Sequence, residues 1–209
     1  MMRSIAFPSL AGLALFCAAC GTDTVASATQ ETAAPERPVD STLLIVPGHR
    51  LGPLTVLQRM DSVANTIGTP TFSDSGAGTT VSTYRLADGA DSAELVLILT
   101  FEPTDNMRKD LQVARTTARK FHDSYGIGVG SQREELESRY NLEGPLSTFA
   151  VAGDSVRLYD TGTGLSFEFD ARGTCRGLAV HAQSRYPTSN YRPDYPEMAT
   201  NNLPAVRGQ

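Results

Sequence analysis

The sequence predicts an α+β fold, in which two helix-plus-β-meander repeats form one antiparallel sheet with both helices packed on one face. Three observations support this fold class. Residues 54–68 align with residues 127–141, which indicates an internal repeat. Each copy ends in a residue that accepts the left-handed C-terminal position of a helix, Gly68 or Asn141, and a proline follows soon after. Alternating apolar runs separated by turn residues then predict strands behind each helix.

One helix is expected in each repeat. In the first, apolar residues recur at i, i+3, i+4 and i+7 and form a single stripe that can pack on a sheet. In the second, Leu136 and Tyr140 lie one turn apart. Ser131 and Glu134 fit a capping box, in which the hydroxyl and the carboxylate satisfy free N–H groups at the helix start. The stripe of the first helix consists of Met60, Val63, Ala64 and Ile67.

Strands are expected after each helix. Residues 165–169, Leu-Ser-Phe-Glu-Phe, are apolar at every second position, which is the pattern of a half-buried strand. Residues 106–119 could form either a strand or a helix, because their charges and long side chains suit both. The expected strands are 80–86, 94–101 and 110–116 in the first repeat, and 147–152, 155–159, 165–169 and 177–182 in the second.

Composition divides the chain into four segments. A short N-terminal apolar segment is followed by a stretch rich in Thr, Ala, Ser, Pro and Glu, which cannot bury enough surface to order itself. The last residues hold few aliphatic side chains, so they too are expected to be disordered. The expected segments are a signal peptide at 1–19, a tether at 20–42, a folded domain at 43–184 with units of 43–118 and 119–184, and a tail at 185–209.

The N-terminus has the order of a secretory signal. Arg3 provides the positive charge, an apolar run follows, and the small residues Ala18 and Ala19 precede Cys20. Residues 16–20 resemble the lipobox of bacterial lipoproteins, with Cys17 in the place that leucine usually takes. This resemblance implies cleavage before Cys20 and a lipid on its thiol. The alternative is an ordinary signal peptide, which would leave Cys20 as a plain thiol.

The predicted anchor implies a location and a class of partner. Gly21 stands where an aspartate would act as an inner-membrane retention signal in enteric bacteria, so we expect the protein on the outer membrane, facing the periplasm. The expected partners are the membrane, through the lipid on Cys20, and another envelope protein. The formal net charge of −5 argues against nucleic acid as a partner.

Two short stretches carry a further resemblance. Residues 45–70, which begin Ile-Val-Pro-Gly, and residues 125–131, Tyr-Gly-Ile-Gly-Val-Gly-Ser, resemble the tandem repeats of β-lactamase-inhibitor-protein-like domains. They are also similar to small outer-membrane lipoproteins of the β-barrel assembly machinery. The resemblance covers about residues 43–184. It implies a helix-plus-sheet fold whose members mostly bind other proteins, and it supplies no catalytic residue.

Four features were weighed as candidate chemistry. The glycines at 126, 128 and 130 suit a phosphate cradle, but a tight turn before a helix explains them better. Ser155 suits a nucleophile with His181 as base, although a turn between two strands is the favoured interpretation. Cys175 is expected to be an unreactive structural thiol, because no other cysteine is available to it in the domain. The remaining histidines, His49 and His122, show no metal-ligand spacing.

The leading functional hypothesis is a non-enzymatic, lipid-anchored domain that binds or scaffolds another envelope protein. We assign no catalytic, cofactor-binding or metal-binding residue, and the only modified residue we predict is Cys20. One alternative is a periplasmic serine hydrolase with Ser155 as nucleophile. Another is a carrier of a small apolar ligand, held in the groove between the sheet and the helices.

Overall fold

The computed structural model describes residues 40–102, 105–151 and 153–183. The predicted signal peptide, Cys20, Gly21, almost all of the tether and the tail at 185–209 lie outside the described residues. The folded part of the chain can therefore be compared with the sequence predictions, whereas the anchor stays a prediction.

The predicted α+β fold class is wrong, because the domain is mostly β. Of the described residues, 55% lie in strands and 9% in helices. The two helices seen in the described ranges are α1, Met60–Ile67, and α2, Arg133–Glu137. Segments of eight and five residues are too short to cover a sheet of eight strands, so no helical layer packs over it.

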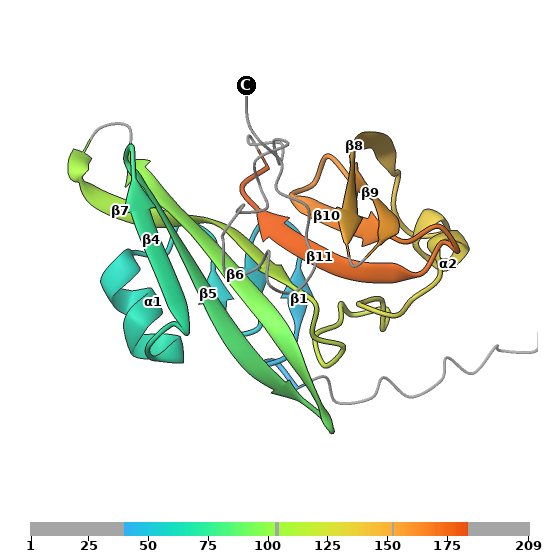
Figure 1. The fold of residues 1–209 in the computed structure, drawn as a ribbon, viewed down its shortest axis with the longest axis horizontal. Coiled ribbons are helices and arrows are strands. Elements are labelled where there is room, and N and C mark those ends of the chain that lie inside the picture. The colour runs from blue at the N-terminus through green and yellow to red at the C-terminus, as the bar shows by residue number, and fades with distance from the viewer. Residues whose placement is uncertain (1–39, 103–104, 152, 184–209) are drawn as a thin grey trace, which may run out of the picture. The chain divides into compact units, whose positions relative to one another are not determined.

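Eight antiparallel strands form the main sheet, and three short strands form a second one (Figure 1). The order in the main sheet is β4-β5-β6-β7-β11-β10-β9-β8, so β11, the last strand within the described ranges, lies in the middle. The small sheet contains β1 (Ile45–Val46), β2 (Arg50–Leu51) and β3 (Leu54–Thr55). The main sheet contains β4 (Phe72–Gly76), β5 (Thr79–Asp88), β6 (Asp91–Glu102), β7 (Asp105–Thr116), β8 (Glu143–Val151), β9 (Asp154–Asp160), β10 (Leu165–Phe169) and β11 (Cys175–His181).

Most individual strands were predicted well. The segment 165–169 coincides with β10, and the ambiguous segment 106–119 is mainly the strand β7. A turn at Asp88-Gly89 joins β5 to β6 in a long hairpin, whose pairing runs from Asp88–Asp91 to Thr79–Thr100. The edge strand β4 was not anticipated, because its exposed Phe-Ser-Asp-Ser-Gly sequence has no apolar alternation.

The second helix differs from its prediction at both ends. It starts after Gln132, which makes no side-chain capping bond, so the Ser131–Glu134 capping box is wrong. The Ser131 hydroxyl instead accepts a hydrogen bond from the N–H of Gly128 at 3.3 Å. Tyr140 lies beyond the helix and packs its ring 5.7 Å from that of Phe167. The Ser131 hydroxyl therefore contacts the glycine-rich loop, and the first N–H of the helix is bound by the carbonyl of Gly173.

The main hydrophobic core lies between one face of the main sheet and the small sheet with the two helices. Val63 of α1 and Leu136 of α2 are both buried in it, as the sequence predicted. The opposite face of the sheet holds a smaller apolar cluster around Leu158 and Ala179. The buried sheet side chains of the main core include Leu95, Leu97, Leu99, Leu111, Leu165, Phe167, Phe169, Leu178 and Val180.

Candidate functional site

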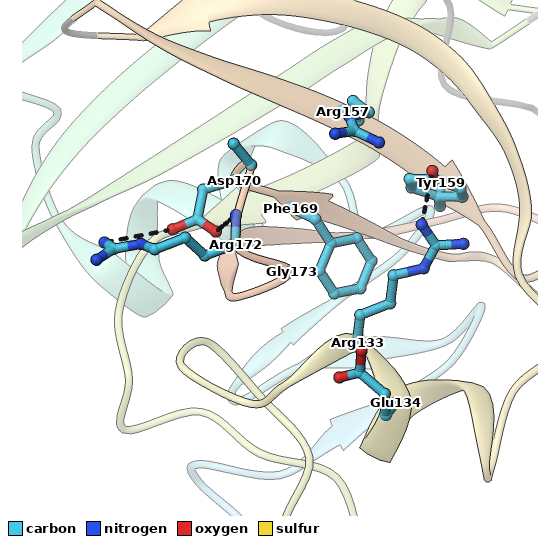
Figure 2. A pocket seen from close by; sticks show the side chains of 9 residues that line it. Arg133, Glu134, Arg157, Tyr159, Phe169, Asp170, Arg172 and Gly173 are labelled. Atoms are coloured by element: carbon cyan, nitrogen blue, oxygen red, sulfur yellow. Dashed lines mark hydrogen bonds and ion pairs between the residues drawn. The ribbon is translucent and has the colours of Figure 1, made fainter.

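A polar hollow of about 220 Å³ opens between α2, the strands β9 and β10, and the turn that follows β10 (Figure 2). Figure 2 shows Arg157, Tyr159 and Arg133 along one side of the hollow and Asp170 with Arg172 along the other. The residues that line it are Arg133, Glu134, Arg157, Tyr159, Phe169, Asp170, Ala171, Arg172 and Gly173. Three arginines that are separated in the sequence therefore line one hollow.

Strand pairing and a tight turn position these side chains. Arg157 is paired with Phe169, so the two side chains lie on the same face of the sheet. The carboxylate of Asp170 accepts hydrogen bonds from the backbone N–H groups of Arg172 at 2.9 Å and Thr174 at 3.0 Å, which shapes the turn. The carbonyl of Gly173 then accepts the N–H of the first helical residue of α2 at 2.8 Å. The turn after β10 and the start of α2, which both line the hollow, are thus joined by a backbone hydrogen bond.

Arg133 has its charge matched within the chain. Its Nε lies 2.7 Å from a carboxylate oxygen of Glu137, and this hydrogen bond raises the pKa of Arg133. Its Nη1 donates to the hydroxyl of Tyr159 at 3.0 Å, and its guanidinium lies 4.5 Å from the centre of that ring. The arginine is held in one orientation and keeps the phenol oxygen at the wall of the hollow.

Arg157 is in a different situation. Arg157 is half-buried, and within the described ranges no carboxylate or other side chain pairs with its guanidinium. Arg172 is mostly exposed and lies 3.9 Å from Asp170, which also has Arg176 at 3.8 Å. A planar guanidinium beside a hydroxyl group can hold a carboxylate or phosphate with two parallel hydrogen bonds. The hollow can therefore bind an anionic group without rearranging the pairs around it.

A second polar cluster lies on the opposite face of the sheet and is sealed from solvent. Asp160, Ser166 and His181 are each at most 1% exposed. The Ser166 hydroxyl donates to Asp160 Oδ2 at 2.6 Å, and His181 Nε2 lies 2.8 Å from the same oxygen and 2.9 Å from the hydroxyl. Burial by itself would raise the pKa of Asp160, but hydrogen bonds from His181 and Ser166 outweigh it and hold the pKa below its ordinary value.

This serine–histidine–aspartate cluster does not have the geometry of a nucleophilic triad. In a triad the histidine uses one ring nitrogen for the serine and the other for the aspartate. Here Nε2 faces both partners, while Nδ1 lies 3.0 Å from the carbonyl oxygen of Ala182. The hydroxyl of Ser166 is already donated to the carboxylate and has no access to a substrate. The cluster satisfies buried polar groups on adjacent strands.

A buried ion pair completes the polar network on this face. Arg115 donates from Nε and Nη2 to the two carboxylate oxygens of Glu168 at 2.6 and 2.8 Å, and from Nη1 to Glu94 at 2.5 Å. Gly177 gives this pair its space, because a Cβ atom there would lie 2.7 Å from Glu168 Oε2. The sequence indicated polar side chains on this face of β10 but gave no sign that they are buried.

The structure separates the two residues of the alternative hydrolase hypothesis. Ser155 is exposed at the start of β9 and pairs with Ala150 in the β8–β9 hairpin. His181 is on β11, with β10 between the two strands, and it contacts Asp160 and Ser166. No geometry supports Ser155 as a nucleophile activated by His181, whereas the turn interpretation matches its position.

The glycine-rich loop, the thiol and the other histidines have structural surroundings. A Cβ atom on Gly128 would lie 2.3 Å from the carbonyl oxygen of Phe121, so glycine is needed there for close backbone packing. Cys175 is buried, and burial raises the pKa of its thiol to about 12. His49 is exposed, while His122 bonds its own loop. In the described part of the chain, no three His, Cys, Asp or Glu side chains cluster as metal ligands would.

Sequence reasoning missed the hollow entirely. Its arginines are separated by many residues, and no motif connects them. The only local signal was the Arg172-Gly173 turn, because the turn residues place a basic side chain at the end of β10. The pairing of Arg157 with Phe169 depends on strand register, which the sequence did not show.

Comparisons with known proteins identify no family for this chain. No family model matches it, and no curated protein matches it. Among solved structures, the chain is similar to a DUF4309 family protein, YjgB, from Bacillus subtilis subsp. subtilis str. 168, with 14% identity and a TM-score of 0.35. The match covers 63% of this chain and 84% of that protein, and it is too distant to support an argument about fold or function. No helix within the described ranges is long and apolar enough to cross a membrane.

Proposed function

We propose that this protein is a membrane-tethered, non-catalytic binding domain that holds an anionic group of its ligand in the hollow at Arg157. The observation that carries the proposal is the position of this guanidinium, half-buried in a hollow and without a carboxylate partner among the described residues. Burial of a charge is costly unless the charge is paired. A ligand that supplies the missing negative charge gains more here than at an exposed arginine, because less water screens the pair.

The proposed class of partner follows from the chemistry of the hollow and from the predicted cellular location. A carboxylate on another envelope protein has the charge and the planar shape that a guanidinium recognises. The signal-like N-terminus and the Ala18-Ala19-Cys20 approach support a lipid on Cys20, which would place the domain on the periplasmic side of the outer membrane. Nucleic acid is disfavoured by the net charge of −5.

The non-catalytic part of the proposal is supported by the buried Asp160–Ser166–His181 cluster. Its hydroxyl is committed to the carboxylate and is fully buried, so it cannot attack a substrate without a change in the sheet. His181 contacts Asp160 and Ser166 and not the exposed Ser155, whose strand partner is Ala150. Recognition of an anionic group requires none of these groups.

Calorimetric titration of the full chain with glutarate and with inorganic phosphate tests the binding site. Arg157→Gln should weaken binding of the preferred anion at least about tenfold, which corresponds to about 1.4 kcal/mol. Arg119→Gln is the matched control, because Arg119 is exposed and lies outside the hollow. Equal affinities for the wild type and Arg157→Gln would contradict the proposal.

The anchor is tested separately by labelling growing cells with a fatty-acid analogue. Wild-type protein should carry the label and sediment with outer-membrane markers, whereas Cys20→Ser should be unlabelled. Equal labelling of the two proteins, or fractionation with inner-membrane markers, would contradict the predicted anchor or its location. Neither outcome would affect the anion-binding test.

A further inference from the structure

The strand β8 forms one edge of the main sheet, next to the hollow. It pairs with β9, and no strand in the described ranges pairs with its other side. Its first part is irregular, because the register shifts between Glu143 and Ser147 around Pro145. From Ser147 to Val151 each residue pairs in register with β9, so the outer edge there presents regularly spaced backbone groups.

This regular part of the edge lacks the usual protection against pairing. Natural edge strands are commonly interrupted by charged side chains or proline, which prevent another chain from adding to the sheet. Residues 146–151, Leu-Ser-Thr-Phe-Ala-Val, contain neither. Leu146, Thr148 and Ala150 are exposed, and none of the six residues is glycine or an acidic residue, the types that disfavour strands. The edge is therefore suited to accept an extended segment.

The register places this edge beside the unpaired guanidinium. Thr148 is directly opposite Arg157, so the two side chains lie on the same face of the sheet. An added strand would lie about 4.8 Å beyond β8 and about twice that distance from β9. A long arginine side chain and a glutamate side chain can together span such a gap, and the small side chain of Thr148 leaves the path between them open.

We infer that β8 accepts an extended acidic segment of a partner protein as a ninth strand, with the carboxylate of the residue opposite Thr148 bound by Arg157. Main-chain hydrogen bonds to residues 147–151 would supply affinity, and the ion pair would select the sequence and its register. The inference rests on the proposed function, because it takes the hollow at Arg157 as the anion site.

Charge favours an acidic partner over a second copy of this chain. Two copies joined through β8 would place both Arg157 side chains on one sheet, with only uncharged residues 147–151 between them. Such a pair would leave both guanidinium groups without a carboxylate from the joined edges. An acidic segment neutralises the same charge and completes the sheet in one step.

Fluorescence anisotropy with short synthetic peptides tests the inference on the full chain in detergent. The probe is an eight-residue peptide of alternating Thr and Val with one central Glu. Matched peptides carry Gln in place of Glu, or N-methyl groups on alternate backbone amides that prevent strand pairing. The wild type should bind the Glu peptide at least about tenfold more tightly than the Gln peptide, and the control variant Arg119→Gln should show the same difference. Arg157→Gln should remove this difference, and the N-methylated peptide should not bind.

Amide hydrogen exchange distinguishes the possible occupants of the edge. Binding of the Glu peptide should slow exchange of those amides of residues 147–151 that point away from β9, which are open before the peptide is added. Protection of these amides without peptide overturns the inference. If the protection depends on protein concentration, the occupant of the edge is a second copy. If it is independent of concentration, the occupant is another part of the same chain.

Two further outcomes separate this inference from the proposed function. If glutarate or phosphate binding depends on Arg157 but the N-methylated peptide binds as well as the Glu peptide, strand addition is wrong and the anion site stands. If neither the small anions nor the peptides respond to Arg157→Gln, both proposals are wrong.

Discussion

Two arginines on opposite faces of the same sheet show how differently one residue type can be used. Arg115, on β7, is 2% exposed and is bound by both oxygens of Glu168 and by Glu94. Arg157, on β9, is half-buried in the hollow without a carboxylate partner in the described ranges. Register causes the difference. It places Gly177 of the intervening strand β11 opposite Glu168, which lets Glu168 and Arg115 meet, whereas Phe169 and Thr148 are paired with Arg157.

This comparison indicates which polar groups contribute to stability and which are available for binding. A buried arginine whose donors are satisfied by carboxylates is part of the folded structure, and loss of either partner leaves a buried charge alone. A half-buried arginine without such a partner contributes little to folding and can take one from a ligand. The experiments that follow test this distinction, beginning with the largest expected effect.

Breaking the buried pair should be the most damaging change. Glu168→Gln leaves Arg115 without its bidentate carboxylate, and Arg115→Met leaves two carboxylates without their cation, so either should lower the free energy of unfolding by about 3–5 kcal/mol. Urea unfolding followed by circular dichroism measures this loss. The double variant Arg115→Met with Glu168→Leu should recover much of it, because the fully buried carboxylate is removed together with its cation and the remaining carboxylate, Glu94, is partly exposed. A loss below about 1 kcal/mol for both single variants would show that the pair is not structural.

Leu136 connects the hollow to the core, because it is the fully buried residue of the helix that carries Arg133 and Glu134. Leu136→Ala should cost about 2–5 kcal/mol through lost burial and a cavity. Leu57→Ala is a matched control, since Leu57 is 54% exposed and its loss should cost less than about 0.5 kcal/mol. Similar melting temperatures for the two variants would contradict the placement of α2 in the core.

The sealed cluster should give the domain an acid-sensitive component of stability. The pKa of Asp160 lies below its ordinary value, so its stabilising contribution is present above the unfolded value of about 3.9 and is lost as pH falls through the folded value. Asp160→Asn should cost about 1–3 kcal/mol at pH 7, because the hydrogen bonds from His181 and Ser166 lose their charged acceptor. Urea unfolding at pH 7, 5 and 3 should show a shallower decline for the variant. An identical pH profile would show that Asp160 does not titrate differently in the folded state.

Arg157→Gln should change stability least. Its guanidinium has no ion pair to lose within the described ranges, so the free energy of unfolding should stay within about 0.5 kcal/mol of the wild type. The same variant should lose anion binding in the titration described above. A large loss of stability would place Arg157 with Arg115 as a structural residue and would remove the distinction between them.

Local pattern predicted the strands better than the fold class. The alternation at residues 165–169 gave the bounds of β10, because strand side chains alternate whatever covers the two faces. The helical prediction failed around Ser131, since a capping pattern can be used equally well by a loop, as the contact with Gly128 shows. The sequence predicts a helical layer from two short helical segments, because nothing in their residues indicates how little of the sheet they cover.

The candidate site depends on contacts between segments far apart in sequence. Arg133 reaches Tyr159 from another element, and Arg157 faces the hollow through its pairing with Phe169. Neither contact has a sequence signal, because register and the path of the chain between elements set them. Burial of Ser166 and Glu168 was also not predictable, since polar residues at alternate positions of a strand ordinarily face water.

The central position of β11 has a consequence for how the chain folds. The sheet cannot become continuous until Cys175–His181 is inserted between β7 and β10, and these are the last strand residues of the domain to be synthesised. Until then β7 has an open inner edge, and the two halves of the sheet are not hydrogen-bonded to each other. Folding should therefore be slow and cooperative, with a rate limited by this late long-range pairing. A chain that emerges gradually would therefore complete this sheet only after β11 is free to pair.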